Sequence, residues 1–234
     1  MKRLSWVAML PFYLLTFILV IGIAKGSSDA VSAINKNEPI ERTHRIIIDA
    51  GHGGIDGGAT SCTGVLESAI NLEIALRLND LMHFLGYETV MIRTTDTSIY
   101  TDGSSIAAQK VSDLNERVRI VNETEGGVLV SIHQNIFSDS RYGGAQVFYS
   151  NDPNSKALAT SMQNLLVKTL NIGSKRVSKK ASGVYLMEHI NTCGILIECG
   201  FISNPEEEAK LRNEEYQRKL CCVIGSALSG FLNT

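Results

Sequence analysis

The sequence lacks the cysteine pattern of a structural zinc ribbon or of a disulfide-built fold. No C-x-x-C pair occurs, and the five cysteines are scattered over 234 residues. They are Cys62, Cys193, Cys199, Cys221 and Cys222. A cysteine-based zinc ribbon is therefore excluded, and a disulfide framework is not expected from so few cysteines. The odd count leaves at least one free thiol if the chain is monomeric.

The sequence also lacks the basic excess that nucleic-acid-binding proteins carry. Its formal net charge is −2, so we expect no nucleic-acid partner. It contains no internal repeat and no low-complexity tract. What is present is the composition of a globular protein, with 44% apolar residues and enough length for one ordinary domain plus a short extra segment.

The N-terminus differs from the rest of the chain. Lys2 and Arg3 precede an uncharged apolar run over residues 4–24, which is long for a secretory h-region of about 7–15 residues and close to the roughly 20 that span a membrane. We expect residues 1–26 to be a signal peptide or a membrane anchor, and either one engages the membrane and exports the remainder. Residues 27–42 are polar and predict a linker, which leaves residues 43–234 as the exported domain.

Short apolar runs typical of buried strands alternate with helical patterns along this domain. We expect strands at 45–49, 89–92, 128–132, 145–149, 184–187 and 195–197, and helices at 70–85, 112–122, 156–169 and 205–232, the last of which allows a break in two. The polar stretch 94–111 predicts a loop. This order predicts a single α/β domain, with a twisted, mostly parallel sheet of about six strands and helices on both faces.

Three ionisable residues follow expected buried strands. His52 comes after the first strand, His133 after the third and Glu198 after the last, while Glu67 stands just ahead of the long helix. Ligands of open α/β sheets bind outside the carboxyl ends of the strands. We therefore expect these side chains to converge in one crevice.

Two histidines and one carboxylate are a known ligand set for catalytic zinc, which leaves a fourth position for water. Zinc lowers the pKa of such a water to about 7, and a further carboxylate is needed to move its proton. We assign His52, Glu67 and His133 as zinc ligands and Glu198 as the general acid/base. A lone histidine is more often structural, which is how we interpret His83 inside a helix, and His44 is expected to be exposed. His189 ranks below the two chosen histidines.

Two other sites are considered for the same residues. The glycine-rich loop at 51–58 resembles a dinucleotide-binding turn, but Asp56 stands where the third glycine belongs and the helix begins late. Cys199 as a nucleophile is disfavoured because it alternates to the opposite strand face from Glu198. An ion pair is the alternative for Glu198, although a carboxylate inside an apolar strand is costly without a function.

Four motifs together resemble the zinc-dependent N-acetylmuramoyl-L-alanine amidases. IDAGHGGIDGGA at 48–59 resembles the opening motif with its ligand His52, and Glu67 matches the second ligand. SIHQN at 131–135 matches the third ligand at His133, and IECGFISNP at 197–205 resembles the catalytic-glutamate motif at Glu198. The resemblance covers roughly residues 45–232. It implies one zinc ion and hydrolysis of the bond between the lactyl group of N-acetylmuramic acid and L-alanine in peptidoglycan.

Departures from the family pattern are small. Ala50 stands where many members have Pro, and Cys199 where Ala is common. The chain is most similar to the germination-specific, spore-cortex amidases, since it combines one N-terminal apolar segment with a bare catalytic domain. This similarity implies a role in forming the cortex muramic lactam. The autoinhibitory insertion of some members is absent after Asn135, so control is left to expression timing, zinc supply or an activating protein partner.

Other functions stay open at this stage. A catalytically silent wall-binding or regulatory protein on the same fold is one alternative, although all four expected site residues are present. A general cell-wall autolysin is the second. A zinc peptidase that cuts within the stem peptide is the third, and analysis of the products distinguishes it. The domain itself is expected in the cell wall or the forespore intermembrane space, either secreted or membrane-anchored.

Overall fold

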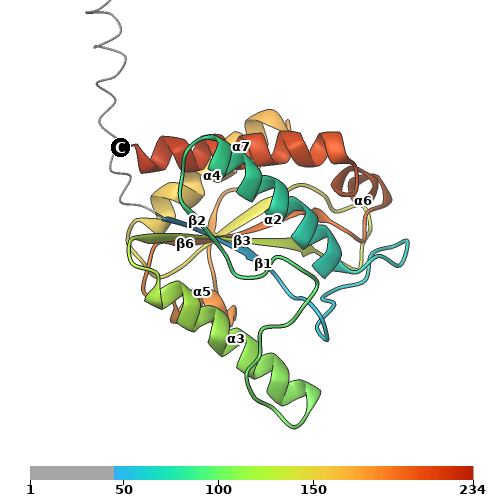
Figure 1. The fold of residues 1–234 in the computed structure, drawn as a ribbon. Helices are drawn as coiled ribbons and strands as arrows, with labels where there is room; N and C mark the ends of the chain where they lie inside the picture. The colour runs from blue at the N-terminus through green and yellow to red at the C-terminus, as the bar shows by residue number, and fades with distance from the viewer. Residues whose placement is uncertain (1–44, 234) are drawn as a thin grey trace, which may run out of the picture. The chain divides into compact units, whose positions relative to one another are not determined.

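The computed structural model describes residues 45–233, which form one six-stranded sheet flanked by helices (Figure 1). The strands are β1 (Arg45–Ala50), β2 (Thr89–Met91), β3 (Gly127–Asn135), β4 (Gln146–Tyr149), β5 (Lys179–Lys180) and β6 (Gly194–Phe201). The helices are α2 (Glu67–Phe84), α3 (Ile106–Glu123), α4 (Ser155–Thr169), α5 (Tyr185–His189), α6 (Pro205–Leu211) and α7 (Glu214–Leu232).

The sheet order is β2-β1-β3-β6-β4-β5, and every neighbouring pair is parallel except β4 with β6. The central strands β1, β3 and β6 are almost entirely buried. Their continuous apolar sequences follow from this position, because a parallel strand covered on both faces has no side left for polar residues. The expected α/β class with a mostly parallel sheet is confirmed.

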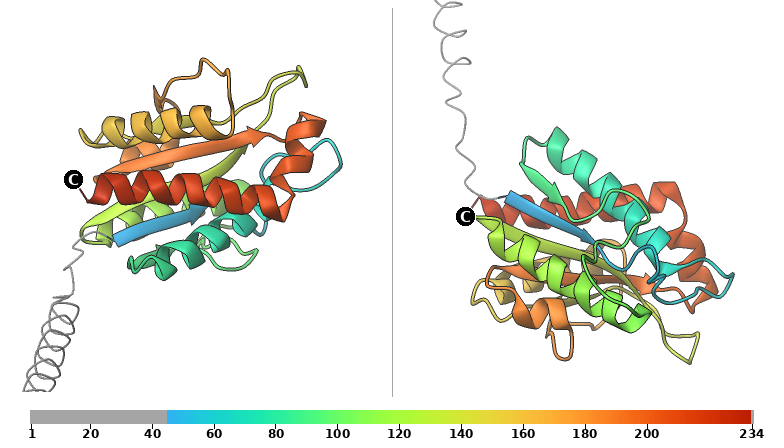
Figure 2. Two further views of the ribbon diagram at one scale, coloured as in Figure 1. Left: turned by 90° about the horizontal axis from the view of Figure 1, so that it is seen from above. Right: turned by 60° about the horizontal axis from the view of Figure 1, so that its bottom comes forward.

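Helices cover both faces of the sheet (Figure 2). Helices α2, α4 and α7 lie on one face, where Ile46, Ile48 and their neighbours meet a large apolar cluster. Helices α3 and α5 lie on the other face, where Ile47 and Leu129 pack in a smaller cluster. Successive residues of β1 thus enter opposite cores, as the strand's side-chain alternation requires.

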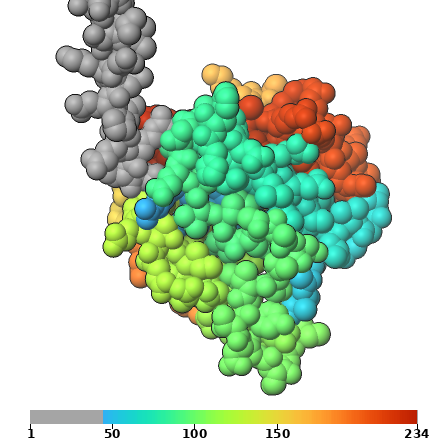
Figure 3. Space-filling model, viewed as in Figure 1, coloured from blue at the N-terminus to red at the C-terminus, as the bar shows by residue number. Residues whose placement is uncertain are grey.

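Two expectations for the second face are wrong. Residues 106–111 are helical rather than loop, because α3 begins at Ile106. The cap residue is Ser105, not Ser112 or Asp113, and its side chain accepts a hydrogen bond from the amide of Ala108 at 3.2 Å. The helix was not predicted there because these first turns project from the domain, so that even Ile106 and Val111 stay exposed and form no buried stripe (Figure 3). Val184–Met187, expected as a strand, overlaps the short helix α5, and β5 was not predicted. A four-residue apolar run does not distinguish strand from helix.

Smaller differences concern where elements end. Glu67 is the first residue of α2 rather than the residue ahead of it, and His133 and Glu198 lie inside β3 and β6 rather than after them. The expected break in the last helix occurs between α6 and α7. The predicted leader, the linker and His44 lie outside the described residues. Within the described range, no helix is both long and apolar enough to cross a bilayer.

Candidate metal centre

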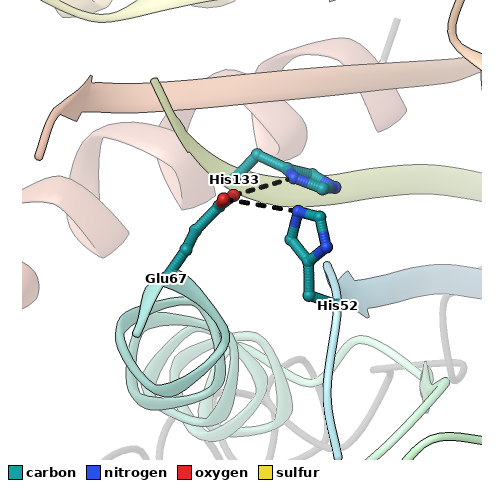
Figure 4. A group of neighbouring side chains, drawn as sticks. All are labelled: His52, Glu67 and His133. Carbon is teal, nitrogen blue, oxygen red and sulfur yellow. Dashed lines mark hydrogen bonds and ion pairs between the residues drawn. The ribbon is translucent and has the colours of Figure 1, made fainter. Parts of the chain in front are cut away.

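Three of the predicted site residues meet at the carboxyl edge of the sheet, each from a different element. His52 lies in the loop after β1, Glu67 opens α2 and His133 lies near the end of β3. One potential ligand atom from each lies within 4.8 Å of the others. Figure 4 shows the two imidazole rings turned toward the same carboxylate.

The Glu67 carboxylate is the centre of this group. His133 Nδ1 lies 3.0 Å from its Oε1, and His52 Nε2 lies 3.3 Å from its Oε2. Glu67 is buried, with 4% of its surface exposed. Burial raises the pKa of Glu67, but the two histidines outweigh it and hold the pKa well below its usual range. The side chain is therefore a carboxylate at neutral pH.

Several uncharged groups also fix Glu67. The backbone N–H groups of Ala59 and Gln134 donate to it, both at 3.0 Å, and the Asn71 amide donates to Oε1 at 3.3 Å. Asn71 also donates to the carbonyl of Gly51 at 3.1 Å. Hydrogen bonds to the charged form orient a carboxylate before any ligand arrives. Glu67 is thus preorganised by the loop after β1 and by β3.

The outer nitrogen of His52 is held by a second carboxylate. Nδ1 lies 2.8 Å from Asp56 Oδ2, and Lys110 on α3 donates to Asp56 Oδ1 at 2.8 Å. Burial lowers the pKa of His52, but Glu67 and Asp56 outweigh it and raise the pKa to about 9. A carboxylate on the outer nitrogen is the usual way in which a metal-ligating histidine is oriented. From the sequence, Asp56 was noted only because it replaces the third glycine of a dinucleotide-binding turn, and its bond to His52 was not predicted.

The loop after β1 makes close contacts that only its own residues allow. A Cβ on Gly51 would lie 2.2 Å from His133 Nε2, so the histidine ring occupies the space that any side chain would need. His52 itself has φ +61°, a conformation that L residues other than glycine rarely adopt. The glycine-rich sequence therefore serves to place two histidines together, and not to hold a phosphate.

Two buried arginines bond the backbone of this loop, and neither was predicted as a site residue from the sequence. Arg93 donates to the carbonyls of Ala50 at 2.7 Å, Gly51 at 3.0 Å and Ser68 at 2.9 Å. Arg117 donates to the carbonyl of His52 at 2.8 Å and pairs with the buried carboxylate of Asp49. Nothing in the local sequence distinguishes them, since an arginine ordinarily predicts a solvated surface.

Arg93 is unusual because it is 3% exposed and yet lies in no ion pair among the described residues. Its remaining hydrogen bond goes to the carbonyl of Thr95 at 3.0 Å, so four backbone oxygens take the place of a carboxylate. One terminal nitrogen bridges Gly51, beside His52, and Ser68, beside Glu67. Arg93 therefore ties the backbones of two candidate ligands to each other.

Glu198 lies beside this group on the neighbouring strand. It pairs in register with His133 across β3 and β6. Its Oε2 is buried and has no hydrogen-bond partner among the described residues. Burial raises the pKa of Glu198 to about 7. The charge of His133 opposes this rise, and the charge of Glu67 adds to it. A carboxyl group in this state exchanges a proton readily near neutral pH.

The other residues weighed from the sequence lie elsewhere. His83 lies in the last turn of α2, and its Nε2 lies 2.5 Å from Thr89 Oγ1. His189 ends α5, where Nδ1 bonds the carbonyl of Tyr185 at 2.8 Å. Cys199 is buried, and burial raises the pKa of its thiol well above the usual value. A neutral, enclosed thiol does not act as a nucleophile.

A cavity of about 340 Å³ opens beside His52 and His133. Lys110 and Leu114 of α3 line one wall, and Val184 and Leu186 line another. Its size suits a small extended ligand. Two of the three candidate metal ligands, His52 and His133, thus border this cavity.

This arrangement matches a known family. The family model described as N-acetylmuramoyl-L-alanine amidase matches residues 46–229. The chain belongs to this family. All four predicted site residues of the amidase fall inside the matched range.

Individual relatives agree with the family match. The amidase is 32% identical over 226 residues to the germination-specific N-acetylmuramoyl-L-alanine amidase of Bacillus subtilis, covering 95% of this chain and 92% of the relative. Among solved structures it is similar to the CwlD amidase of Clostridioides difficile in complex with the GerS lipoprotein. That match has a TM-score of 0.77, 35% identity, and coverage of 81% of this chain and 98% of the other. An N-acetylmuramoyl-L-alanine amidase from Clostridium difficile 630 matches with a TM-score of 0.71 and 31% identity, covering 83% of this chain and 99% of that one.

Proposed function

We propose that this amidase is a zinc enzyme that hydrolyses the bond between the lactyl group of N-acetylmuramic acid and L-alanine in peptidoglycan. The observation that carries the proposal is the convergence of His52, Glu67 and His133 within 4.8 Å, with Glu198 beside them on β6. Three protein ligands with an adjacent free carboxyl group are what a hydrolytic zinc site requires.

The chemistry of the donor set fits zinc. Two imidazole nitrogens face one carboxylate, and the outer nitrogen of His52 is already bonded to Asp56. Nitrogen and carboxylate donors suit zinc, and a set of three leaves one position free for catalysis. We therefore assign His52 Nε2, His133 Nδ1 and a Glu67 oxygen as the ligands of one zinc ion.

Zinc, when bound, supplies a Lewis acid that polarises the amide carbonyl and lowers the pKa of water. Glu198 takes the proton of the attacking water and passes it to the leaving nitrogen of L-alanine. Its unpartnered Oε2 and its raised pKa suit both steps. Asp56 keeps His52 oriented through its Nδ1 while the proton moves.

The names of the relatives support a proposal for the biological setting. One relative is named a germination-specific amidase, and we propose a role for this chain in maturing spore cortex, with the muramic lactam formed after the cut. We further propose that residues 1–26 act as a signal or anchor, that residues 27–42 act as a linker, and that residues 43–234 work outside the cytoplasmic membrane. The solved CwlD amidase is in complex with the GerS lipoprotein, which supports an activating protein partner here as well.

The first experiment is zinc analysis and peptidoglycan hydrolysis on three purified proteins. We expect the wild type to hold one zinc and to release peptides with a new N-terminal L-alanine, detected by mass spectrometry. Glu198→Gln should keep zinc and lose turnover by several orders of magnitude, because proton transfer is lost. His133→Ala should lose both, and zinc retained at full occupancy in that variant would refute the ligand assignment.

A further inference from the structure

Two aromatic side chains stand exposed on the loop that joins β3 to β4. Phe137 is 47% exposed and Tyr142 is 50% exposed. Their ring centroids lie 4.6 Å apart with an interplanar angle of 57°. We call this pair the aromatic platform. Exposed apolar side chains that gather in one place mark binding surfaces far more often than single exposed residues do.

The platform is anchored to the segment that follows β6. The backbone N–H of Phe137 donates to Ser203 Oγ at 3.1 Å, and Asn204 donates to the carbonyl of Tyr142 at 3.2 Å. The buried ring of Phe201 lies next to Tyr142, with 6.4 Å between ring centroids. Both ends of the loop are therefore fixed to one rigid part of the domain.

A second layer holds the same segment. Glu207 accepts from the backbone N–H groups of Gly144 at 2.7 Å and Phe201 at 2.8 Å. Arg176 donates to the carbonyl of Gly143 at 3.1 Å, and its guanidinium lies 5.2 Å from the centroid of the Phe201 ring. A surface that is ordered before binding loses little conformational entropy when a ligand arrives.

The platform adjoins the proposed catalytic residues. His133 pairs with Glu198 across β3 and β6, and the next pair in the register is Asn135 with Phe201. The loop leaves β3 at Asn135, so the platform begins one strand pair beyond the catalytic pair. The loop after β1, with His52, projects from the same edge of the sheet as this loop (Figure 2). The loop that carries the platform therefore leaves the sheet next to the proposed catalytic residues.

We propose that the aromatic platform binds the glycan strand of peptidoglycan, a proposal that rests on the function proposed above. A sugar ring has an apolar C–H face that packs on an aromatic ring and a polar rim that needs hydrogen bonds. The loop carries both, since Asp139 and Arg141 stand between the two aromatic residues, paired at 2.7 Å.

The other part of the substrate has its own place. The cavity of about 340 Å³ beside His52 lies between α3 and the start of α5, and it is lined both by charged groups, such as Lys110, and by apolar side chains, such as Leu114 and Val184. A linear stem peptide fits such a cavity better than a glycan strand does. The scissile amide then lies at the metal centre, with glycan on the platform and peptide in the cavity.

The test compares a Phe137→Ala/Tyr142→Ala variant with a Phe84→Ala control. Phe84 is 87% exposed at the end of α2, away from the platform. The zinc-loaded proteins are assayed on two substrates, a glycan strand with several stem peptides and a muramoyl dipeptide. We expect the double variant to raise KM for the strand about tenfold, the effect of two lost ring contacts, with kcat and the dipeptide kinetics unchanged. The control and the conservative Phe137→Tyr/Tyr142→Phe variant should match the wild type.

A binding assay separates this proposal from the proposed function. Peptide-free glycan strands are sedimented with the Glu198→Gln protein with and without the platform substitutions, so no turnover is needed. If the platform substitutions abolish strand binding, the proposal is supported even if the wild type cuts neither substrate. Unchanged strand KM and unchanged strand binding overturn it, and so does a platform that proves to hold only a protein partner. If the double variant does not fold, Phe137→Ala alone provides the same comparison.

Discussion

At the scale of single residues, the site is built on groups whose burial is unfavourable by itself. Glu198 has a buried oxygen without a partner, and Arg93 has a buried guanidinium without a carboxylate. Burying such groups costs free energy, and they therefore concentrate where catalysis or ligand geometry requires them. Both lead to measurable consequences.

The zinc-free protein should show the cost of ionising Glu198. Its pKa is raised from 4.5 to about 7, so the fold favours the protonated acid. The resulting stability is fully present below pH 4.5 and is lost as pH rises through about 7. Glu198→Gln keeps the neutral form at every pH. It should match the wild type near pH 4.5 and be more stable at pH 8, by up to about 3 kcal/mol from roughly 2.5 units at 1.36 kcal/mol each.

Urea unfolding of both metal-free proteins at the two pH values measures this difference. Keeping zinc out matters, because the ion changes the charges that face Glu198. An equal stability difference at pH 4.5 and pH 8 would show that Glu198 does not titrate between them.

Arg93→Lys should weaken zinc binding by about 10- to 100-fold, the range found for groups that orient metal ligands. Lysine keeps the charge but has no planar fork, so it cannot hold Gly51 and Ser68 together as Arg93 does. Competition with a chelator of known affinity measures the change. Arg77→Lys is the matched control, since Arg77 bonds Gln217 on the α2–α7 side. Equal zinc affinity in both variants would reduce Arg93 to a packing role.

At the scale of elements, the N-terminal and C-terminal parts of α3 have different structural roles. Its C-terminal part packs on the sheet through Arg117 and Val121, the only buried residues of the helix. Its first turns project from the domain and carry Lys110 to Asp56 (Figure 3). The projecting part depends on its cap, because it has little burial to stabilise it.

Ser105→Ala should destabilise the protein by about 1 kcal/mol, the usual effect of removing a helix N-cap. The loss should be local, with faster hydrogen exchange of backbone amides at the start of α3. Ser104→Ala is the control, because the neighbouring serine is exposed and is not the cap residue. Equal exchange rates in the two variants would mean that the first turns are held by other contacts.

At the scale of the whole molecule, the proposed ligands come from a loop, a helix and a strand that are far apart in sequence. An ion bound by all three links elements that the unfolded chain cannot bring together. Zinc should therefore raise the stability of the native protein, by about 4 kcal/mol when free zinc is a thousandfold above its Kd.

Thermal unfolding with and without zinc tests this linkage. The midpoint should rise with zinc for the wild type and for Asp80→Asn, an exposed change on the same helix, and should stay constant for Glu67→Gln. The same rise in all three proteins would place the zinc elsewhere.

The sequence predicted the α/β class, the mostly parallel sheet and the positions of His52, Glu67, His133 and Glu198 as a set. The fold prediction is confirmed because strand patterns are local. The structure also brings the four side chains to one edge of the sheet, because the carboxyl ends of parallel strands converge there, while their chemical roles stay a prediction. The N-terminal turns of α3 were missed because they project from the domain and form no buried apolar stripe. The helix α5 was missed because it is too short to show a period.

What the amino-acid sequence determined by itself is the type of sheet and the identity of the groups available for chemistry. Only the tertiary structure decided how those groups are held. Arg93 bonded to the carbonyls of Gly51 and Ser68, Lys110 bonded to Asp56, and the platform fixed to the segment after β6 all join residues distant in sequence. Such contacts depend on which atoms the folded chain brings within hydrogen-bond distance, and no local pattern records that.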